Sequence, residues 1–289
     1  QQLLNMKTIY IFLFLFAAIT TYAQSKVITQ AIVSTVTNVI ATESNDADIK
    51  TITTSDGQQF TFNQYSNGKS KTTTWLKNQM VKTYWQDEMS VITIYRDNEK
   101  KQTTTISERM GKKSGYYATD TEQVAFLKQL DSIMQSQGLK KSAAENSKNN
   151  KDFTITYLDE SKIIIGYTCK KALIIEITAN KSHDTTIVWY CPDFKLQNLP
   201  STGGIVKVRF RPNGETVYNG MENLTGFPLQ YEKNMSHGRK MTVEVTKLIT
   251  DKEIADKEFE IPKNIEIKPM KDMQSGAGPG VQLRVVGGG

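Results

Sequence analysis

The sequence has few of the residues on which most metal and catalytic sites depend. Its 289 residues include two cysteines and two histidines. No second cysteine lies two to four positions from Cys169 or Cys191, as a structural zinc site would require. The chain also lacks the GxxxxGK[ST] and GxGxxG phosphate-binding motifs, the GxSxG nucleophile motif and the HExxH zinc motif. These absences argue against nucleotide binding and the common hydrolase classes, and we expect no cofactor and no metal.

Long apolar runs and concentrated charge are also scarce. Hydrophobic residues make up 38% of the chain, and 36 basic side chains face 30 acidic ones. The basic residues are scattered as doublets such as Lys100-Lys101 and Lys140-Lys141, whereas a nucleic-acid binder concentrates them in a stripe with aromatics between them. We therefore expect an ordinary folded chain that is neither membrane-embedded nor a partner of nucleic acid.

The first 23 residues have the pattern of a targeting segment. After Met6-Lys7-Thr8 comes an apolar run from Ile9 to Ile19, then small residues at Thr21 and Ala23. This run is shorter than the roughly 20 residues that span a bilayer. The pattern predicts a signal peptide that starts at Met6 and is cleaved after Ala23. We therefore expect a periplasmic or secreted product without a transmembrane anchor.

The rest of the chain is typical of short antiparallel strands. Apolar and polar residues alternate in short pieces separated by turn signals such as Asp56-Gly57 and Asn67-Gly68. The expected strands include Phe60–Phe62, Val81–Trp85, Val91–Tyr95, Phe153–Tyr157, Ile163–Tyr167, Val206–Arg211 and Met241–Thr246. The sequence thus predicts a mostly β fold, with one β-rich domain over residues 24–270.

One segment has helical spacing instead. Thr119 and Glu122 form a capping-box pattern, and apolar residues then recur on one helical face. This predicts a helix over residues 121–137 that covers one face of the sheet or binds a partner. An exposed linker is expected over 140–152, between a front half (residues 25–138) and a back half (153–270). A glycine-rich flexible tail is expected over 271–289.

The two cysteines lie on neighbouring predicted strands. A three-residue loop at Ala179-Asn180-Lys181 would make positions that sum to 360 face each other, and Cys169 then faces Cys191. In an exported protein this register predicts a cross-strand disulfide bond. Two free or separately buried thiols are the alternative, since a register slip of one or two residues would separate the sulfurs.

The histidines give little support to catalysis. His183 and His237 lie in polar, turn-like stretches with no neighbouring nucleophile. A Ser–His–Asp triad assembles from distant positions, so spacing alone leaves it open, but no motif favours it. We therefore expect no catalytic residue and a protein that is not an enzyme.

Aromatic residues are the more promising feature. Trp75, Trp85, Trp189 and Tyr190 are candidates to line a concave sheet face that holds an apolar ligand. The alternative is that they form ordinary cross-strand pairs in the core.

The back half resembles a family of exported bacterial proteins. The residues that carry this resemblance are Ile165-Gly166-Tyr167-Thr168-Cys169-Lys170-Lys171-Ala172, Val188-Trp189-Tyr190, Gly226-Phe227-Pro228-Leu229 and Phe259-Glu260-Ile261-Pro262. They are similar to a Gram-negative family of unknown function related to the GLPGLI-type proteins. The likeness extends over Phe153–Pro269, although Leu224 to Pro228 replaces the GLPG element and Cys191 stands where the cousins usually carry a threonine or similar residue.

The resemblance implies a fold like that of the outer-membrane lipoprotein carriers (LolA/LolB-like). In that fold an open half-barrel takes an acyl chain on its concave face, where Phe227 would join the aromatic candidates. The expected function is non-catalytic binding of a lipid or of a lipoprotein acyl chain. An envelope protein-interaction module is the alternative, and a hydrolase ranks last.

Overall fold

The computed structural model describes residues 25–41, 49–53, 59–63, 67–109, 111–126, 128, 152–177, 183–197, 220–235 and 238–275. Several predicted features lie outside these residues: the signal peptide over 1–23, the strand Val206–Arg211, the linker apart from Asp152, and the tail beyond residue 275.

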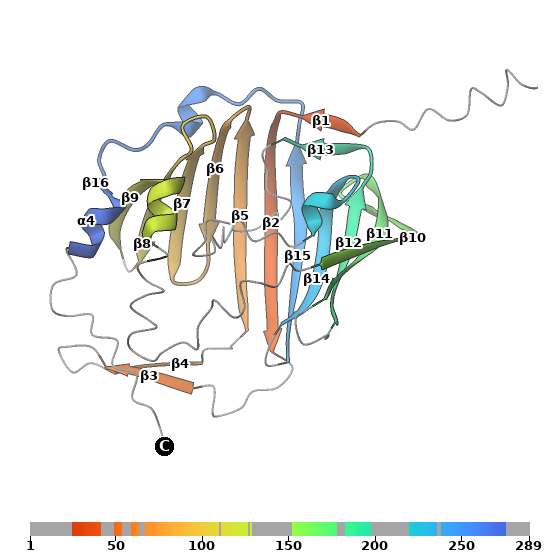
Figure 1. Cartoon of the computed structure of the whole chain (residues 1–289), viewed down its shortest axis with the longest axis horizontal. Helices are drawn as coiled ribbons and strands as arrows, with labels where there is room; N and C mark the ends of the chain where they lie inside the picture. The colour runs from red at the N-terminus through yellow and green to blue at the C-terminus, as the bar shows by residue number, and fades with distance from the viewer. Residues whose placement is uncertain are drawn as a thin grey trace, which may run out of the picture.

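One curved, open sheet of twelve strands dominates the molecule (Figure 1). Its strands, in spatial order, are β10 (Asp152–Ile164), β11 (Tyr167–Ile177), β12 (His183–Cys191), β14 (Phe227–Met235), β15 (Arg239–Ile249), β2 (Gln30–Ala41), β5 (Gly68–Lys77), β6 (Met80–Gln86), β7 (Ser90–Asp97), β8 (Gln102–Arg109), β9 (Lys112–Thr119) and β16 (Ile267–Pro269). All neighbours are antiparallel except β16, which runs parallel to β9. The mostly β prediction is confirmed, and the antiparallel prediction holds for all but the short strands.

Two small sheets accompany the large one. Strand β1 (Lys26–Ile28) pairs in parallel with β13 (Phe194–Leu196), and β3 (Ile49–Thr53) pairs with β4 (Gln59–Asn63). The β1–β13 pair lies across one end of the large sheet, at the top of Figure 1.

Strands from the two halves of the chain meet in the middle of the large sheet. Strand β2 pairs with β15 from Ile32 opposite Ile249 to Ala41 opposite Arg239. The front half then forms a meander from β5 to β9, because each strand is joined to the next by a close turn. The back half supplies β10, β11, β12, β14 and β15 on the other side.

One predicted strand is wrong. The segment Ile163–Tyr167 was expected to be continuous, but Ile165 and Gly166 have φ angles of 42° and 86° and form a two-residue turn between β10 and β11. Positive φ at both central residues is the geometry of a type I′ hairpin. A β-branched residue rarely adopts positive φ, so Ile165 conceals this turn in the sequence.

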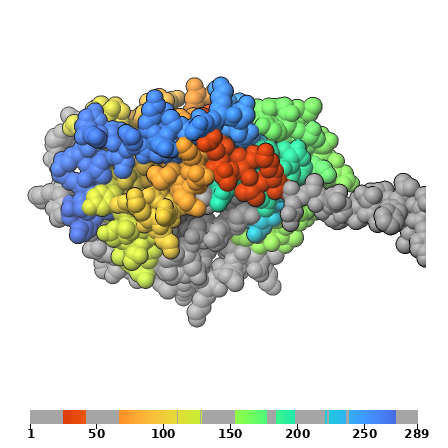
Figure 2. Space-filling view, turned by 90° about the horizontal axis from the view of Figure 1, so that it is seen from above, coloured from red at the N-terminus to blue at the C-terminus, as the bar shows by residue number. Residues whose placement is uncertain are grey.

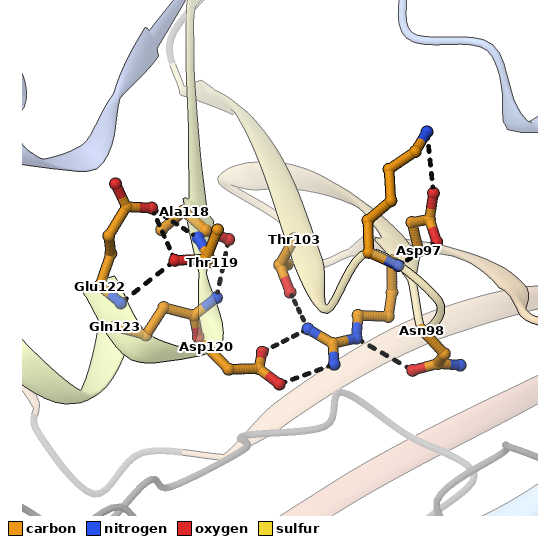
Figure 3. A network of polar contacts seen from close by, with 10 residues as sticks. Asp97, Asn98, Thr103, Ala118, Thr119, Asp120, Glu122 and Gln123 are labelled. Atoms are coloured by element: carbon orange, nitrogen blue, oxygen red, sulfur yellow. Dashed lines mark hydrogen bonds and ion pairs between the residues drawn. The ribbon is translucent and has the colours of Figure 1, made fainter.

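The predicted helix begins one residue early, at Asp120, and is described through Phe126 and at Lys128. Its capping box is confirmed (Figure 3): the Thr119 amide donates to Glu122 Oε2 at 2.7 Å, and the Glu122 amide donates to Thr119 Oγ1 at 3.3 Å. The guanidinium of Arg96 on β7 also donates to both carboxylate oxygens of Asp120, at 2.5 and 2.9 Å. This ion pair attaches the first turn of the helix to the sheet.

The sheet has a concave face and an outer face, which the register defines. Val33, Thr74, Thr83 and Ile94 are successive partners across β2, β5, β6 and β7 and lie on the concave face. The helix at Asp120 lies over this side, toward the viewer in Figure 1. Seen from above, the helix (yellow-green) lies at the front of the molecule, and the residues after β15 (blue) extend along its back (Figure 2).

Candidate functional site

In the back half, the concave face is an apolar wall. Ala172, Ile174, Val188, Tyr190, Tyr231 and Val243 come from β11, β12, β14 and β15 and pack into one buried cluster. The 3-10 turn η2 (Met221–Asn223) covers this wall. Its neighbours Gly220 and Leu224 complete a segment that we call the cap (residues 220–224). Leu224 is fully buried and Met221 is 3% exposed, so the cap seals the wall.

Gly220 is required where the cap begins. Its φ angle of 80° is left-handed, and a Cβ there would lie 2.8 Å from Ile174 and 2.9 Å from the Phe153 ring. Only glycine satisfies both the angle and the close approach.

In the centre of the sheet, four threonines lie among the apolar residues of the concave face. Thr35 on β2, Thr72 and Thr74 on β5, and Thr83 on β6 are all buried, and we call them the threonine floor. The hydroxyls of Thr74 and Thr83 are 3.4 Å apart and hydrogen-bonded. The hydroxyl of Thr35 is buried and has no hydrogen-bond partner among the residues that the structure describes. A buried polar atom without a partner destabilises the folded chain, and such atoms are rare in folded proteins.

On the opposite side, the outer face of β5 to β8 is covered by a later part of the chain. Residues 250–266, which we call the strap, include the 3-10 turn η3 (Asp256–Phe259). Lys77 of β5 binds Asp256 at 2.6 Å, and Lys82 of β6 binds Glu258 at 3.3 Å. Burial, together with the negative charge of Glu258, raises the pKa of Tyr95 beneath the strap.

The five aromatic candidates do not come together. The pairing of Trp75 with Lys82 and of Trp85 with Thr72 places these two tryptophans on opposite faces. Trp189 and Tyr190 are consecutive on β12 and also diverge. Tyr190 lies in the apolar wall, whereas Trp189 has the ammonium of Lys162 4.2 Å from its ring. Phe227 stacks on Phe194 near the β1–β13 pair, with ring centroids 5.7 Å apart. The ammonium of Lys82 is likewise 4.8 Å from the ring centroid of Trp75. Four of the five thus serve core packing or pairing with lysine.

The cysteines lie in a separate apolar cluster. Cys169 and Cys191 are both fully buried free thiols, and they pack with Ile164, Phe194, Leu196 and Phe227. Burial raises the pKa of Cys169 to about 11, and the neighbouring Cys191 contributes to that rise. Burial also raises the pKa of Cys191. The predicted register is confirmed, since Lys170 faces Tyr190 and Ile177 faces His183.

The other predicted polar residues form no site. His183 is the first residue of β12, opposite Ile177, and His237 lies outside the described residues. Among the residues that the structure describes, no three His, Cys, Asp or Glu side chains gather as a metal site would require. Within the same residues, no helix has the length and apolar character needed to cross a membrane.

Sequence reasoning missed the threonine floor. Thr72-Thr73-Thr74 is a polar run, so nothing in it indicates burial. A possible signal was the strict alternation of β2, in which Ala31, Val33 and Thr35 share one face.

Comparison with known proteins gives only distant similarities. No protein-family model matches the chain, and no curated protein matches it. Two structures of PNGF-II are 15% and 16% identical, with TM-scores of 0.32 and 0.33. Each match covers 85% of this chain, which spans about one third of the length of PNGF-II. A structure described as an outer membrane lipoprotein-sorting protein domain from Vibrio parahaemolyticus is 8% identical, with a TM-score of 0.24, over 80% of this chain and 89% of that one. TM-scores this far below 0.5 do not establish a shared fold, and the expected GLPGLI-type family has no matching model.

Proposed function

We propose that the chain is an exported binding protein of the bacterial envelope, without catalytic activity, that holds an apolar ligand on its concave sheet face. A lipid or the acyl chain of a lipoprotein suits such a face. The observation that carries this proposal is the threonine floor, and above all the unpartnered hydroxyl of Thr35.

The floor has the chemistry that a lipid ester needs. Threonine methyl groups offer apolar contact to an acyl chain. The Thr35 hydroxyl is buried and without a partner, so it can donate to an ester or carboxyl oxygen of a ligand. The apolar wall on β11 to β15 continues the same face but is covered by the cap, so the proposed ligand lies over the threonine floor.

Binding of cis-parinaric acid, a naturally fluorescent fatty acid, tests this proposal on the delipidated mature protein. We expect uptake at about one probe per chain. Thr35→Val keeps the side-chain shape but removes the hydroxyl, so affinity should fall by roughly fivefold to tenfold, which is the effect of one hydrogen bond. Without ligand, the same variant should be at least as stable as the wild type, because an unpaired buried hydroxyl is lost.

Thr73→Val is the matched control. Thr73 lies on the outer face of the neighbouring strand β5, where its hydroxyl is 3.3 Å from that of Ser34 on β2. Its replacement should leave probe uptake unchanged. A delipidated wild-type protein that takes up no probe contradicts the proposal.

A second candidate function, protein–protein interaction, is favoured by the edge of the sheet at β10, which pairs on only one side within the described part of the chain. Strand β10 is the first strand in the sheet order, and Ile163 at its end is 75% exposed. Tyr157 and Ile165 are exposed nearby. Unpaired backbone groups beside exposed apolar side chains suit the addition of a strand from another protein. If this function is correct, affinity capture from envelope extract recovers a partner with the wild type and loses it with Ile163→Lys.

A further inference from the structure

We propose that Cys169 and Cys191 form a disulfide bond between β11 and β12 while the chain folds, and that burial then fixes their redox state. The proposal concerns a modification site in the apolar cluster beside β1 and β13. It is independent of any ligand on the concave face.

The register places the two residues opposite each other. Lys170 and Tyr190 are the last paired residues of β11 and β12, and Cys169 and Cys191 occupy the next position on each strand. Directly opposed residues of antiparallel strands have Cα atoms roughly 4.5 to 5.5 Å apart. A disulfide bond requires a Cα separation of about 4.4 to 6.8 Å. Extended by one position beyond Lys170 and Tyr190, the register gives the two cysteines the backbone spacing that a cross-strand bridge needs.

The surroundings hold the second cysteine in place. Strand β14 passes so close to the end of β12 that Gly226 lies against the backbone of Cys191 and Pro192, where any Cβ would collide. Cys191 also pairs with Phe227, and the Phe227 ring stacks on Phe194. Cys169 is held on its other side by pairing with Lys162. Both cysteines thus have paired strands on the side away from the bridge, which keeps their backbones at fixed positions.

Bond formation requires an oxidant, which we identify as a low-molecular-weight or protein disulfide of an oxidising compartment. The thiolate of one cysteine attacks a sulfur of that disulfide, whose S–S bond breaks to release one thiolate. The second cysteine then attacks the mixed disulfide and displaces the other half of the oxidant. The two cysteines lose two protons and two electrons, and the oxidant becomes two thiols.

In the folded state, the cysteines can no longer react with the oxidant. Both thiols are fully buried, and at pH 7 a thiol with a pKa of about 11, as for Cys169, is a thiolate in roughly one molecule in 10⁴. Exchange needs an accessible thiolate, so a chain that has folded with reduced cysteines should stay reduced. A chain that folds in the presence of the oxidant should acquire the bridge before the cluster closes.

The test compares the full chain exported with its own leader and the mature chain made in a reducing cytoplasm. Each chain is denatured in the presence of iodoacetamide, which alkylates free thiols, and its intact mass is measured by mass spectrometry. We expect no alkylation of the exported chain unless it is first reduced, and two adducts on the cytoplasmic chain. The cytoplasmic chain should gain the bridge with oxidised glutathione in urea but not when folded. Two alkylated cysteines in the exported chain without prior reduction would overturn the proposal.

Stability gives a second readout. A bridge across a loop of this length should lower the unfolding equilibrium constant on the order of 100-fold relative to the reduced chain. Cys169→Ala and Cys191→Ala remove the bridge and should each show the same stability with and without reductant. A wild-type chain whose stability is also insensitive to reductant contradicts the proposal even if a variant folds poorly.

Discussion

The chain segments that return over the sheet cover different faces of its two halves. In the back half the cap covers the concave face, and the outer face carries Trp189 beneath the ammonium of Lys162. In the front half the strap covers the outer face, where Tyr95 and Ile106 are buried. The strands of the two halves alternate in the same way, so the difference comes from the segments that return over them. The cap thus completes the burial of the apolar wall in one half, and the strap completes the burial of Tyr95 and Ile106 in the other.

Removing one large side chain from the cap or from the strap gives the largest expected effect. Leu224→Ala in the cap and Phe259→Ala in the strap should each lower the free energy of unfolding by about 3 kcal/mol, because each empties a buried site. Hydrogen exchange should then separate the two variants. Leu224→Ala should speed exchange in β11 and β12, and Phe259→Ala in β6 and β7.

Ile261→Ala is the control for both variants. Ile261 lies on the strap but is 41% exposed, so its loss should change stability by less than about 1 kcal/mol. If Leu224→Ala and Phe259→Ala speed exchange equally in all these strands, the halves do not differ as described.

The same substitution, glycine to alanine, can be compared at one closely packed position in each half of the sheet. Gly226 in the back half lies against the backbone of Cys191, whereas a Cβ on Gly115 in β9 would meet the end of the Ile267 side chain. Backbone moves less easily than a side-chain terminus. We expect Gly226→Ala to cost about 3 kcal/mol and Gly115→Ala about 1 kcal/mol or less, measured by urea unfolding. Equal costs would mean that the end of β12 adjusts more freely than its pairing indicates.

Local patterns in the sequence foretold much of this fold. Alternation of apolar and polar residues predicted β6, β7 and β15, and the capping box predicted the start of the helix. A three-residue loop after β11 predicted the β11–β12 register, in which paired residue numbers sum to 360. Each of these depends on neighbouring residues and on one short-range rule. The turn at Ile165 was missed because a β-branched residue there occupies a conformation that it rarely adopts.

The candidate site could not be foreseen in the same way. Burial of Thr35 and Thr72 depends on their place in the middle of the sheet, which follows from the pairing of β2 with β15 across more than 200 residues. Trp75 and Trp85 lie on opposite faces because side chains alternate between the faces along β5 and β6. The number of aromatic residues in these strands does not indicate which face each one occupies. Contacts between distant segments have no local signal, so composition alone suggested one aromatic surface where the structure has several.

The helix cap of the front half gives the smallest effect and the most local test. The amide and hydroxyl of Thr119 hold the pKa of Glu122 below its ordinary value, with the amide as the larger cause. A lowered pKa in the folded state means that this stabilisation is present above the unfolded value of about 4.3 and is lost as the pH falls through the folded value. Thr119→Val removes the hydroxyl and keeps the amide, so the pKa of Glu122 should rise only part of the way. An NMR titration of the carboxyl carbons measures this, with Asp97 as the internal control, since the Lys100 amide lowers its pKa independently of Thr119. If the pKa values of Glu122 and Asp97 both move, the variant has disturbed β7 and β9 together. The capping box is then coupled to the sheet through the neighbouring Arg96–Asp120 ion pair.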